Sequence, residues 1–229
     1  MQDEADERWR AKQAHYQDPA VVRGYDAARF EGAHQKGSTQ RKWKALRRAL
    51  GPDFDALRSV LDVPCGTGRF TRHLLDARKQ LVQADLSLAM VAAARATAGA
   101  HGGFGRAPQS YRGGVRADAL RLPFADRSFD LVLSIRFLFH VPRELRPAIL
   151  AEYARVSRRF VVVDVRHKYC WTTWSKRARA RLSGRRAPSQ RYSLAEIDAD
   201  VAAGGLVLRE RAWIAPGFSE KMLLVCERR

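Results

Sequence analysis

Short runs of apolar and β-branched residues recur along the chain and alternate with segments of helical character. Helix-compatible segments include Leu86–Ala98, which is rich in alanine, and Glu144–Val156, whose apolar residues have helical spacing. The predicted strands are Ser59–Val63, Leu81–Ala84, Gly114–Ala117, Phe129–Ile135, Phe160–Val165, Leu206–Glu210 and Lys221–Glu227. This alternation predicts an α/β fold, with a largely parallel sheet covered by helices on both faces.

The two ends of the chain depart from this alternation. The last two predicted strands are separated by the turn-like Ala215-Pro216-Gly217, and we expect them to pair as a hairpin. Ser193 with Glu196 three residues later predicts a capped helix that Gly204-Gly205 ends. Residues 1–50 have helical periodicity without strands, so we expect an N-terminal helical arm or lid before a main domain at 51–229.

A glycine-containing turn follows the first predicted strand, in the sequence LDVPCGTGRF from Leu61 to Phe70. Glycine allows a ligand to approach the backbone closely, and the helix after such a turn presents unpaired N–H groups. A single turn of this kind also occurs in proteins that bind no nucleotide. Gly99–Gly114, with six glycines and one proline, is interpreted as a loose connection.

Three aspartates stand at the ends of successive predicted strands. Asp62 lies just before the glycine turn, Asp85 closes the next strand, and Asp118 closes the third. Each alone could cap a turn or a helix. Because the carboxyl ends of parallel strands meet at one edge of a sheet, the three together predict a crevice in which a carboxylate accepts hydrogen bonds from ribose hydroxyls.

These motifs carry a resemblance to a known family. LDVPCGTGRF, QADLSLAM, ADALRLPFADRSFDLVLS and FHVP resemble the class I S-adenosylmethionine-dependent methyltransferases of the broad small-molecule type, over roughly Val60–Val165. The resemblance implies a Rossmann-like, mainly parallel seven-stranded sheet with a C-terminal β-hairpin. It also implies S-adenosylmethionine as cofactor and S-adenosylhomocysteine as product, and it leaves the acceptor open.

Carried over to this chain, the resemblance implies a set of cofactor-binding residues. Asp62 and the glycine turn would hold the methionine part, Asp85 the ribose hydroxyls, and Asp118 the adenine amino group. The other members are Pro64, Gly66, Gly68, Leu86, Ala119 and Ser134. Pro64 is a departure, because the family usually has glycine there and proline removes a backbone donor. Thr71 replaces the third glycine of a dinucleotide fingerprint, which disfavours an NAD-dependent oxidoreductase.

The residues after the fourth predicted strand are candidates for the acceptor side. His140 is the candidate general base, because histidine titrates near neutral pH; capping the next helix or packing below the crevice is the alternative. Phe137 and Phe139 would line an acceptor cavity or pack in the core. Arg136 would pair with an acidic acceptor or with the cofactor carboxylate, or would remain solvated. In the arm, Tyr16, Arg23, Tyr25 and Arg29 resemble positions that close over the cofactor; surface placement on an amphipathic helix is the alternative.

The net charge of +18 is concentrated in two segments. Residues 32–52 hold six basic residues and no acidic one, and residues 166–191 hold nine and none. The rest of the chain carries 27 basic and 24 acidic residues, which is nearly balanced. The basic character therefore describes two local segments rather than the whole surface.

The segment 166–191 forms a basic insertion before the predicted last helix. On a helical wheel Trp171, Trp174, Ala178 and Leu182 share one side, with arginines on the flanks. Trp171 and Trp174 are candidates for acceptor contact. An anionic membrane surface suits this pattern; nucleic acid suits it less well, because no RNA-binding module is recognisable. A solvated helix with tryptophans packed on the domain is a third interpretation.

Composition excludes some classes of protein. No stretch has the length of apolar sequence that a membrane-spanning helix requires, and the N-terminal MQDEADERWR is charged where a secretory signal is apolar. We therefore expect a cytoplasmic protein, peripheral at a membrane surface if 166–191 binds lipid. The three cysteines have no CxxC pair and predict no disulfide framework and no metal site. The predicted acceptor is small or lipid-linked; an RNA methyltransferase and a catalytically silent binding module are the alternatives.

Overall fold

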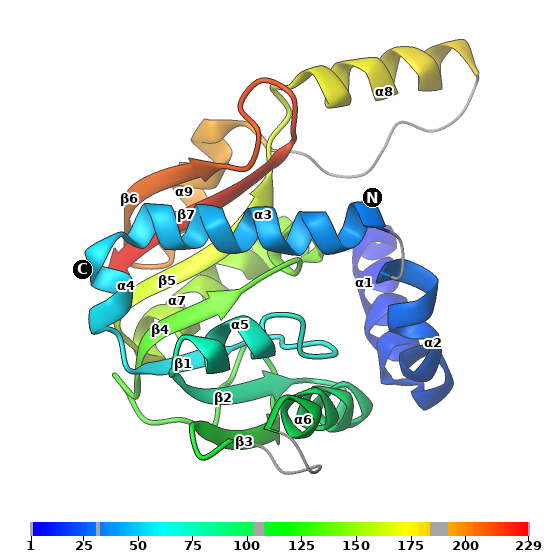
Figure 1. Ribbon diagram of the computed structural model, residues 1–229. Helices are drawn as coiled ribbons and strands as arrows, with labels where there is room; N and C mark the ends of the chain where they lie inside the picture. Colours follow the sequence, from blue (N-terminus) through cyan, green and yellow to red (C-terminus); the bar gives the residue numbers. More distant parts are fainter. Residues whose placement is uncertain (1, 31–32, 103–107, 184–191, 229) are drawn as a thin grey trace.

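A computed structural model describes residues 2–30, 33–102, 108–183 and 192–228 of the chain. Its centre is a seven-stranded sheet in the order β3-β2-β1-β4-β5-β7-β6 (Figure 1). The strands are β1 Ser59–Asp62, β2 Gln80–Asp85, β3 Tyr111–Arg116, β4 Phe129–Ser134, β5 Ser157–Arg166, β6 Leu206–Trp213 and β7 Lys221–Arg228. All seven predicted strands are present, and the predicted α/β class is confirmed.

Helices fill the segments between the strands. The α-helices are α1 Gln2–Gln17, α2 Pro19–Phe30, α3 Ala33–Leu50, α4 Pro52–Ala56, α5 Thr71–Asp76, α6 Leu88–Gly102, α7 Arg146–Val156, α8 Trp171–Leu182 and α9 Leu194–Ala203. Two 3₁₀ turns, η1 Leu138–His140 and η2 Arg143–Leu145, precede α7. The predicted capping box is present, because the Ser193 hydroxyl accepts from the Glu196 N–H and the Glu196 carboxylate accepts from the Ser193 N–H.

The sheet is parallel except at β7. β1 pairs in parallel with β2 on one side and β4 on the other, and β5 pairs in parallel with β4. β7 runs antiparallel to both β5 and β6, so the predicted C-terminal hairpin is confirmed. The strand order reverses at β1, with β2 and β3 on one side and β4 and β5 on the other. A crevice at the carboxyl ends of β1 and β4 follows from this reversal.

The apolar side chains of the strands alternate between two cores. Leu61, Val132 and Val161 belong to the core covered by α7 and α9, whereas the neighbouring side chains belong to the core covered by α3 and α5. Leu46 and Leu50 of α3 are almost fully buried in that second core. The described residues of the predicted arm are helical except for Asp18 between α1 and α2, but the second half of α3 packs on the sheet as part of the domain core.

Glycine has different roles in the segment predicted as a loose connection. Helix α6 extends to Gly102, β3 begins at Tyr111, and residues 103–107 lie outside the described residues. Gly114 is inside β3, where an added Cβ would lie 2.7 Å from Cγ1 of Val91 in α6. Glycine at this position therefore allows the helix to pack closely on the strand.

Three parts of the chain stand apart from the sheet in Figure 1. Helices α1 and α2 lie beyond the carboxyl ends of the parallel strands, and α8 projects away from the body of the molecule. Of the basic insertion, β5 includes Arg166 and α8 covers 171–182, while 184–191 lie outside the described residues. Among the described helices, none combines the length and apolar character needed to cross a bilayer.

Candidate active site

A cavity of about 180 Å³ opens at the carboxyl edge of the sheet, beneath α1–α3. Its wall combines residues that are far apart in the sequence. From the strand ends and the loops after them come Asp62, Pro64, Gly66, Asp85, Leu86, Asp118, Ala119, Arg136, Phe137 and His140. From the N-terminal helices come Trp9, Gln13, Tyr16, Tyr25, Ser38, Thr39 and Lys42.

The two glycines in the turn after β1 have different structural roles. Gly66 has φ +54, and a Cβ added there would meet no protein atom within 4 Å, so its backbone faces open space in the cavity wall. Gly68 has φ +82, and an added Cβ would lie 2.6 Å from Thr71 Oγ1. The first glycine therefore exposes backbone to the cavity, whereas the second permits close packing of the turn.

Asp85 ties the end of β2 to this turn. One carboxylate oxygen accepts a hydrogen bond from the Gly66 N–H at 2.9 Å and the other accepts one from the Ser87 N–H at 2.9 Å. Burial raises the pKa of Asp85, although these backbone donors lower it. Each oxygen keeps a second lone pair, so the carboxylate can accept further hydrogen bonds from a ligand in the cavity.

Asp62 and Asp118 add two carboxyl groups to the same wall. Burial raises the pKa of Asp62 to about 7, with the Gln83 side chain opposing the shift and Asp85 adding to it. Asp118 is exposed, and its carboxylate accepts from the Leu120 N–H at 3.0 Å. A cation or hydrogen-bond donor placed beside this buried carboxyl would stabilise its ionised form and lower its pKa.

The opposite end of the cavity is aromatic and basic. The ring of Trp9 from α1 lies 6.0 Å from that of Phe137, which follows β4. Arg136 has φ +66, and its backbone N–H donates to Asp164 at 2.5 Å. His140 lines the cavity from η1, with its ring 4.2 Å from that of Phe139.

A buried ion pair joins α3 to β5 at this end. Lys42 donates to Asp164, and both side chains are almost completely buried. Burial lowers the pKa of Lys42, and the carboxylate of Asp164 opposes that shift. Lys221 on β7 lies close by and donates to Ser38 Oγ at 3.3 Å. The pair holds α3 over the cavity through side chains that are 122 residues apart.

Several residues expected in the site lie outside its wall. Ser134 is fully buried, with its hydroxyl 3.3 Å from the Tyr153 hydroxyl, and Phe139 is buried under the guanidinium of Arg166. Gly68 is turned away from the cavity by the packing described above. Trp171 and Trp174 are exposed on α8, because that helix projects from the body.

Of the N-terminal residues with predicted roles, some line the cavity and others do not. Tyr16 and Tyr25 line the cavity, and their rings form a T-shaped contact at 5.8 Å. Arg23 is exposed and does not line it. The side chain of Arg29 lies outside the described residues.

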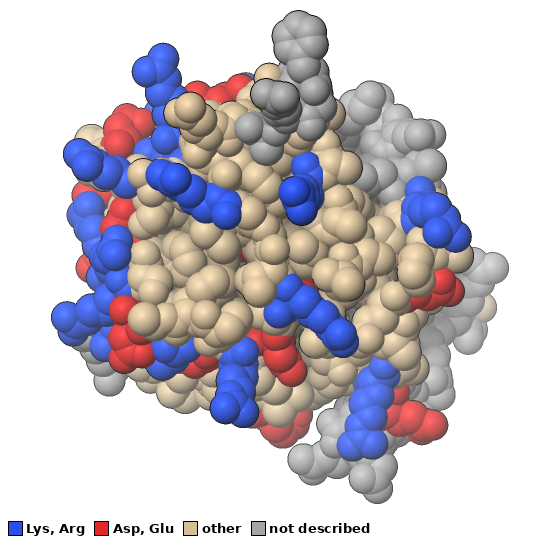
Figure 2. Space-filling model, turned by 90° about the horizontal axis from the view of Figure 1, so that it is seen from below, with Lys and Arg blue, Asp and Glu red and all other residues tan. Residues whose placement is uncertain are grey.

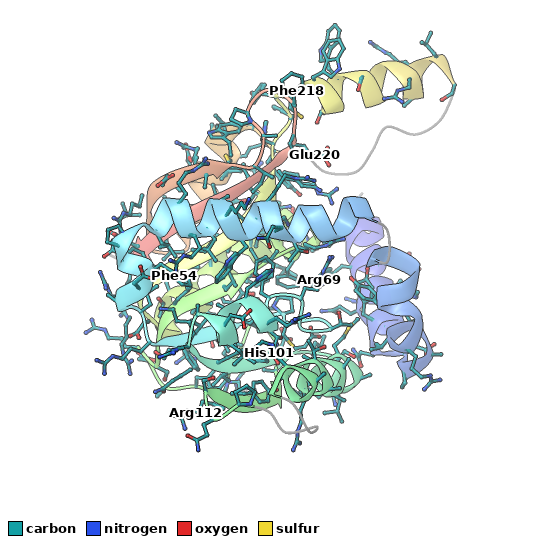
Figure 3. The ribbon with its side chains drawn as sticks, in the orientation of Figure 1. Phe54, Arg69, His101, Arg112, Phe218 and Glu220 are labelled. Carbon is teal, nitrogen blue, oxygen red and sulfur yellow. The ribbon has the colours of Figure 1, made fainter. Side chains whose placement is uncertain are left out.

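Other wall residues were not predicted from the sequence. Trp9 and Gln13 follow helical spacing with the predicted Tyr16 along one face of α1, so a helical projection of the first twenty residues could have found them. Lys42 carried no comparable signal, because its partner Asp164 is remote in the chain. Arg69, which also lines the cavity, lies on the side of the sheet that faces α1 and α2 (Figure 3).

The fold and the sequence point to one family. Magnesium protoporphyrin IX methyltransferase from Synechocystis PCC 6803, crystallised with S-adenosylmethionine, superposes with a TM-score of 0.71 at 16% identity over 97% of both chains. Residues 60–159 match the family model described as a methyltransferase domain. The chain therefore contains a methyltransferase domain, and its fold is the one predicted from the sequence, that of the class I S-adenosylmethionine-dependent methyltransferases. The family predicted from the sequence, and the cofactor that defines it, are thereby confirmed.

Two relatives extend this likeness in sequence. A protein from Encephalitozoon cuniculi, named provisionally as a methyltransferase, is 33% identical over 132 residues. The matched region is 57% of this chain and 53% of that protein. Demethylmenaquinone methyltransferase from Beutenbergia cavernae is 37% identical over 110 residues, which are 46% of this chain and 40% of that enzyme. The matches thus span about half the length of these relatives or less.

The residues of the methyltransferase cavity fit the cofactor of the family. S-adenosylmethionine carries a sulfonium and an ammonium group, and the wall supplies three carboxyl groups at the ends of β1, β2 and beyond β3. The open space beside Gly66 accepts a ligand against the backbone. Pro64 lies in the wall, and the turn is closed without its missing donor, because the Cys65 N–H donates to the Ala84 carbonyl oxygen and the Gly68 N–H to that of Cys65.

Proposed function

We propose that this methyltransferase domain transfers the methyl group of S-adenosylmethionine to an oxygen or nitrogen atom of an anionic acceptor that is small or lipid-linked. The observation that carries the proposal is the division of the cavity wall. Along the sheet edge, the end at β1, β2 and β3 carries Asp62, Asp85 and Asp118, whereas the end at β4 and β5 carries Arg136 and the Lys42–Asp164 ion pair. The first end suits a cationic cofactor and the second an anionic acceptor.

At the carboxylate end, the chain binds and orients the cofactor. When bound, S-adenosylmethionine supplies a methyl group on a positively charged sulfur, which is a good leaving group. Asp85 would accept hydrogen bonds from the ribose hydroxyls while its bonds to Gly66 and Ser87 keep it fixed. Asp62 would face the cationic methionine part and ionise as the cofactor enters.

At the basic end, cations outnumber carboxylates. Lys42, Arg136, Arg166 and Lys221 influence one another there, and the opposing carboxylates are Asp164 and Glu220. Burial and the neighbouring cations lower the pKa of Lys221 to about 8. Burial is the larger cause, and the smaller contribution of the neighbouring cations supports a positive local potential, which would favour an acceptor with a negative charge.

Proton transfer is assigned to His140. Methyl transfer itself needs mainly correct positioning of acceptor and methyl group. An acceptor hydroxyl or protonated nitrogen must also lose a proton, and among the described side chains His140 is the histidine that lines the cavity. His140 is the last residue of η1, three residues after Phe137, so its imidazole would meet the acceptor on that side of the cavity.

Helix α1 supports the reaction by covering the cavity. Trp9, Gln13 and Tyr16 turn one face of the helix toward the wall, and Trp9 contacts Phe137. This cover would exclude water from the acceptor side and strengthen electrostatic interactions inside it.

The proposal is tested first by cofactor binding. Calorimetry should detect binding of S-adenosylmethionine to the parent protein. Asp85→Ala should weaken it by about 100-fold, because charge-assisted hydrogen bonds contribute roughly 1.5–3 kcal/mol each. Asp76→Ala is the control, since Asp76 is exposed on α5 and does not line the cavity. Absence of binding by the folded parent protein would contradict the proposal.

The acceptor is tested by pairs of compounds that differ in charge. Each candidate carboxylic acid or phosphate is compared with its neutral amide or ester, and methyl transfer is followed by release of S-adenosylhomocysteine. We expect the charged member of an active pair to have the lower KM. A consistent preference for neutral or cationic members would reject the anionic acceptor while leaving cofactor binding intact.

A further inference from the structure

Exposed apolar side chains gather at α8 and the loop beside it. Of the eight large hydrophobic residues that are exposed in the described part of the chain, five lie there. They are Tyr169, Trp171, Trp174, Leu182 and Phe218, with exposed fractions of 59%, 64%, 72%, 89% and 70%. Apolar surface gathered in this way marks an interaction site more often than scattered single residues do.

The helix presents these residues on one face. Trp171, Trp174 and Leu182 fall on the same side of a helical projection of α8. Thr173, on a different side, is 1% exposed, and its hydroxyl lies 3.1 Å from Cys170 Sγ. The start of α8 is therefore seated on the domain by another face, and the tryptophans point away from it.

A backbone contact brings the neighbouring loop to this face. The Trp171 N–H donates to the Gly217 carbonyl oxygen at 2.9 Å, so Phe218 lies next to the start of α8. Figure 3 places Phe218 at the base of the projecting helix, on the outer side of the loop between β6 and β7. Segments 47 residues apart in the chain thus contribute to one apolar surface, which we call the α8 surface: Tyr169, Trp171, Trp174, Leu182 and Phe218.

Basic residues border the α8 surface. Arg179 and Arg181 are exposed on the two flanks of the apolar face. No acidic residue occurs between 167 and 195. On the face of the molecule around β3 and α6, by contrast, basic side chains are spread singly, with acidic ones near many of them (Figure 2). The charge beside α8 is therefore local and of one sign.

We propose that the α8 surface docks the protein on a membrane that contains anionic phospholipid. Tryptophan and phenylalanine would enter the headgroup boundary, Leu182 would reach the acyl chains, and Arg179 and Arg181 would meet phosphate groups. RNA fits less well, because bases stack on aromatic rings but leave an almost fully exposed leucine without a partner.

Docking of this kind would also orient the active site. Helix α8 follows the carboxyl end of β5, which is the edge of the sheet where the cavity opens. A lipid-linked acceptor would therefore be held near the side on which the cavity lies. The docking proposal itself does not depend on methyl transfer, because none of the described side chains of α8 lies in the cavity wall.

Vesicle sedimentation tests the proposal on the full chain. We expect binding to vesicles of equal parts phosphatidylcholine and phosphatidylglycerol, and much weaker binding to phosphatidylcholine alone. Replacing both Trp171 and Trp174 by serine should reduce the vesicle partition coefficient by roughly tenfold or more. Replacing both Arg179 and Arg181 by glutamine should also reduce it roughly tenfold.

Two control variants match these changes elsewhere on the surface. Val207→Ser removes an exposed apolar side chain on β6, and Arg112→Gln removes an exposed charge on β3, far from α8 in Figure 3. Both should bind vesicles like the parent protein. Thermal unfolding of every variant distinguishes loss of docking from loss of folding.

A second measurement uses lipids with brominated acyl chains. These should quench fluorescence of the parent protein, and the quenching should disappear when Trp171 and Trp174 are replaced. Equal binding to both kinds of vesicle, no binding to either, or unchanged binding by the tryptophan variant would overturn the proposal. Binding to single-stranded RNA that the same variants abolish, without vesicle binding, would overturn it in favour of nucleic acid.

Discussion

The two ends of the cavity are built differently. The carboxylate end comes from short strand-and-turn segments, and Asp62, Gly66 and Asp85 lie within 24 residues of one another. The basic end brings together Lys42 from α3 and Asp164 from β5, which are 122 residues apart. The first end is fixed by backbone hydrogen bonds to Asp85, and the second by a buried ion pair between side chains.

This difference has a consequence for how the site can change. Backbone hydrogen bonds depend on the course of the chain and survive most replacements of neighbouring side chains. A buried ion pair depends on both partners at once. We therefore expect substitutions at the basic end to alter acceptor selection and stability together, whereas the carboxylate end preserves cofactor binding across such changes.

The largest expected effect comes from breaking the ion pair. Lys42→Met should lower the free energy of unfolding by about 3–5 kcal/mol, because it leaves Asp164 buried without its cation. Equilibrium unfolding in urea measures the change. Lys44→Met, on the exposed side of the same helix, should have little effect.

A double variant distinguishes the ion pair from simple packing. Lys42→Met with Asp164→Leu should recover much of the lost stability, because no buried charge is left unpaired. Equal destabilisation by the single and double variants would mean that the charge pairing is not what holds α3 to β5.

An intermediate effect is expected from the pH dependence of stability at the carboxylate end. Burial raises the pKa of Asp62 from 3.8 to about 7, so the folded state binds more protons than the unfolded state between these values. Stability should therefore fall as pH rises, by roughly 2 kcal/mol between about pH 5 and pH 7 from this group.

Comparison with Asp62→Asn isolates that contribution. The asparagine variant cannot ionise, so its stability should fall less over the same range, and it should bind S-adenosylmethionine weakly. Thermal unfolding of the ligand-free proteins at a series of pH values measures the difference. Parallel pH profiles for the two proteins would contradict the assignment of the shift to Asp62.

The smallest expected effect concerns the aromatic cover. Trp9→Ala removes the contact with Phe137 at the acceptor side and should raise the acceptor KM by about tenfold, a change of about 1.4 kcal/mol. The affinity for S-adenosylmethionine, measured by calorimetry, should stay within about twofold, because the proposed cofactor contacts lie at the carboxylate end rather than at Trp9. A larger loss of cofactor binding than of acceptor binding would show that α1 covers the cofactor instead.

Much of the fold followed from the sequence because its signals are local. Each predicted strand is a short apolar run, and the β-hairpin and the capping box at Ser193 follow from turn and cap residues close by in the chain. The stretch Gly99–Gly114 was interpreted as a loose connection, whereas residues 99–102 end α6 and residues 111–113 begin β3 ahead of the predicted start at Gly114. That difference arises because glycine predicts a turn in sequence, although it also occurs inside helices and strands that pack closely on their neighbours.

The candidate site also has parts that the sequence predicted and parts that it did not. The carboxylates at the strand ends could be predicted, because parallel strands bring their carboxyl ends to one edge whatever lies between them. Trp171 and Trp174 were expected near the acceptor, but the projection of α8 places them on an exposed surface. The direction in which an insertion leaves a domain depends on tertiary packing rather than on its own composition.

The sequence by itself determined the family, the sheet, the carboxylate end of the cavity and the two segments that carry the positive charge. Only the tertiary structure decided which residues of α1 and α3 close the cavity, and that Lys42 is neutralised inside it by Asp164. The physical reason is the range of the interactions. Periodicity, turns and caps act within a few residues, whereas burial and charge pairing depend on segments that meet only when the chain has folded.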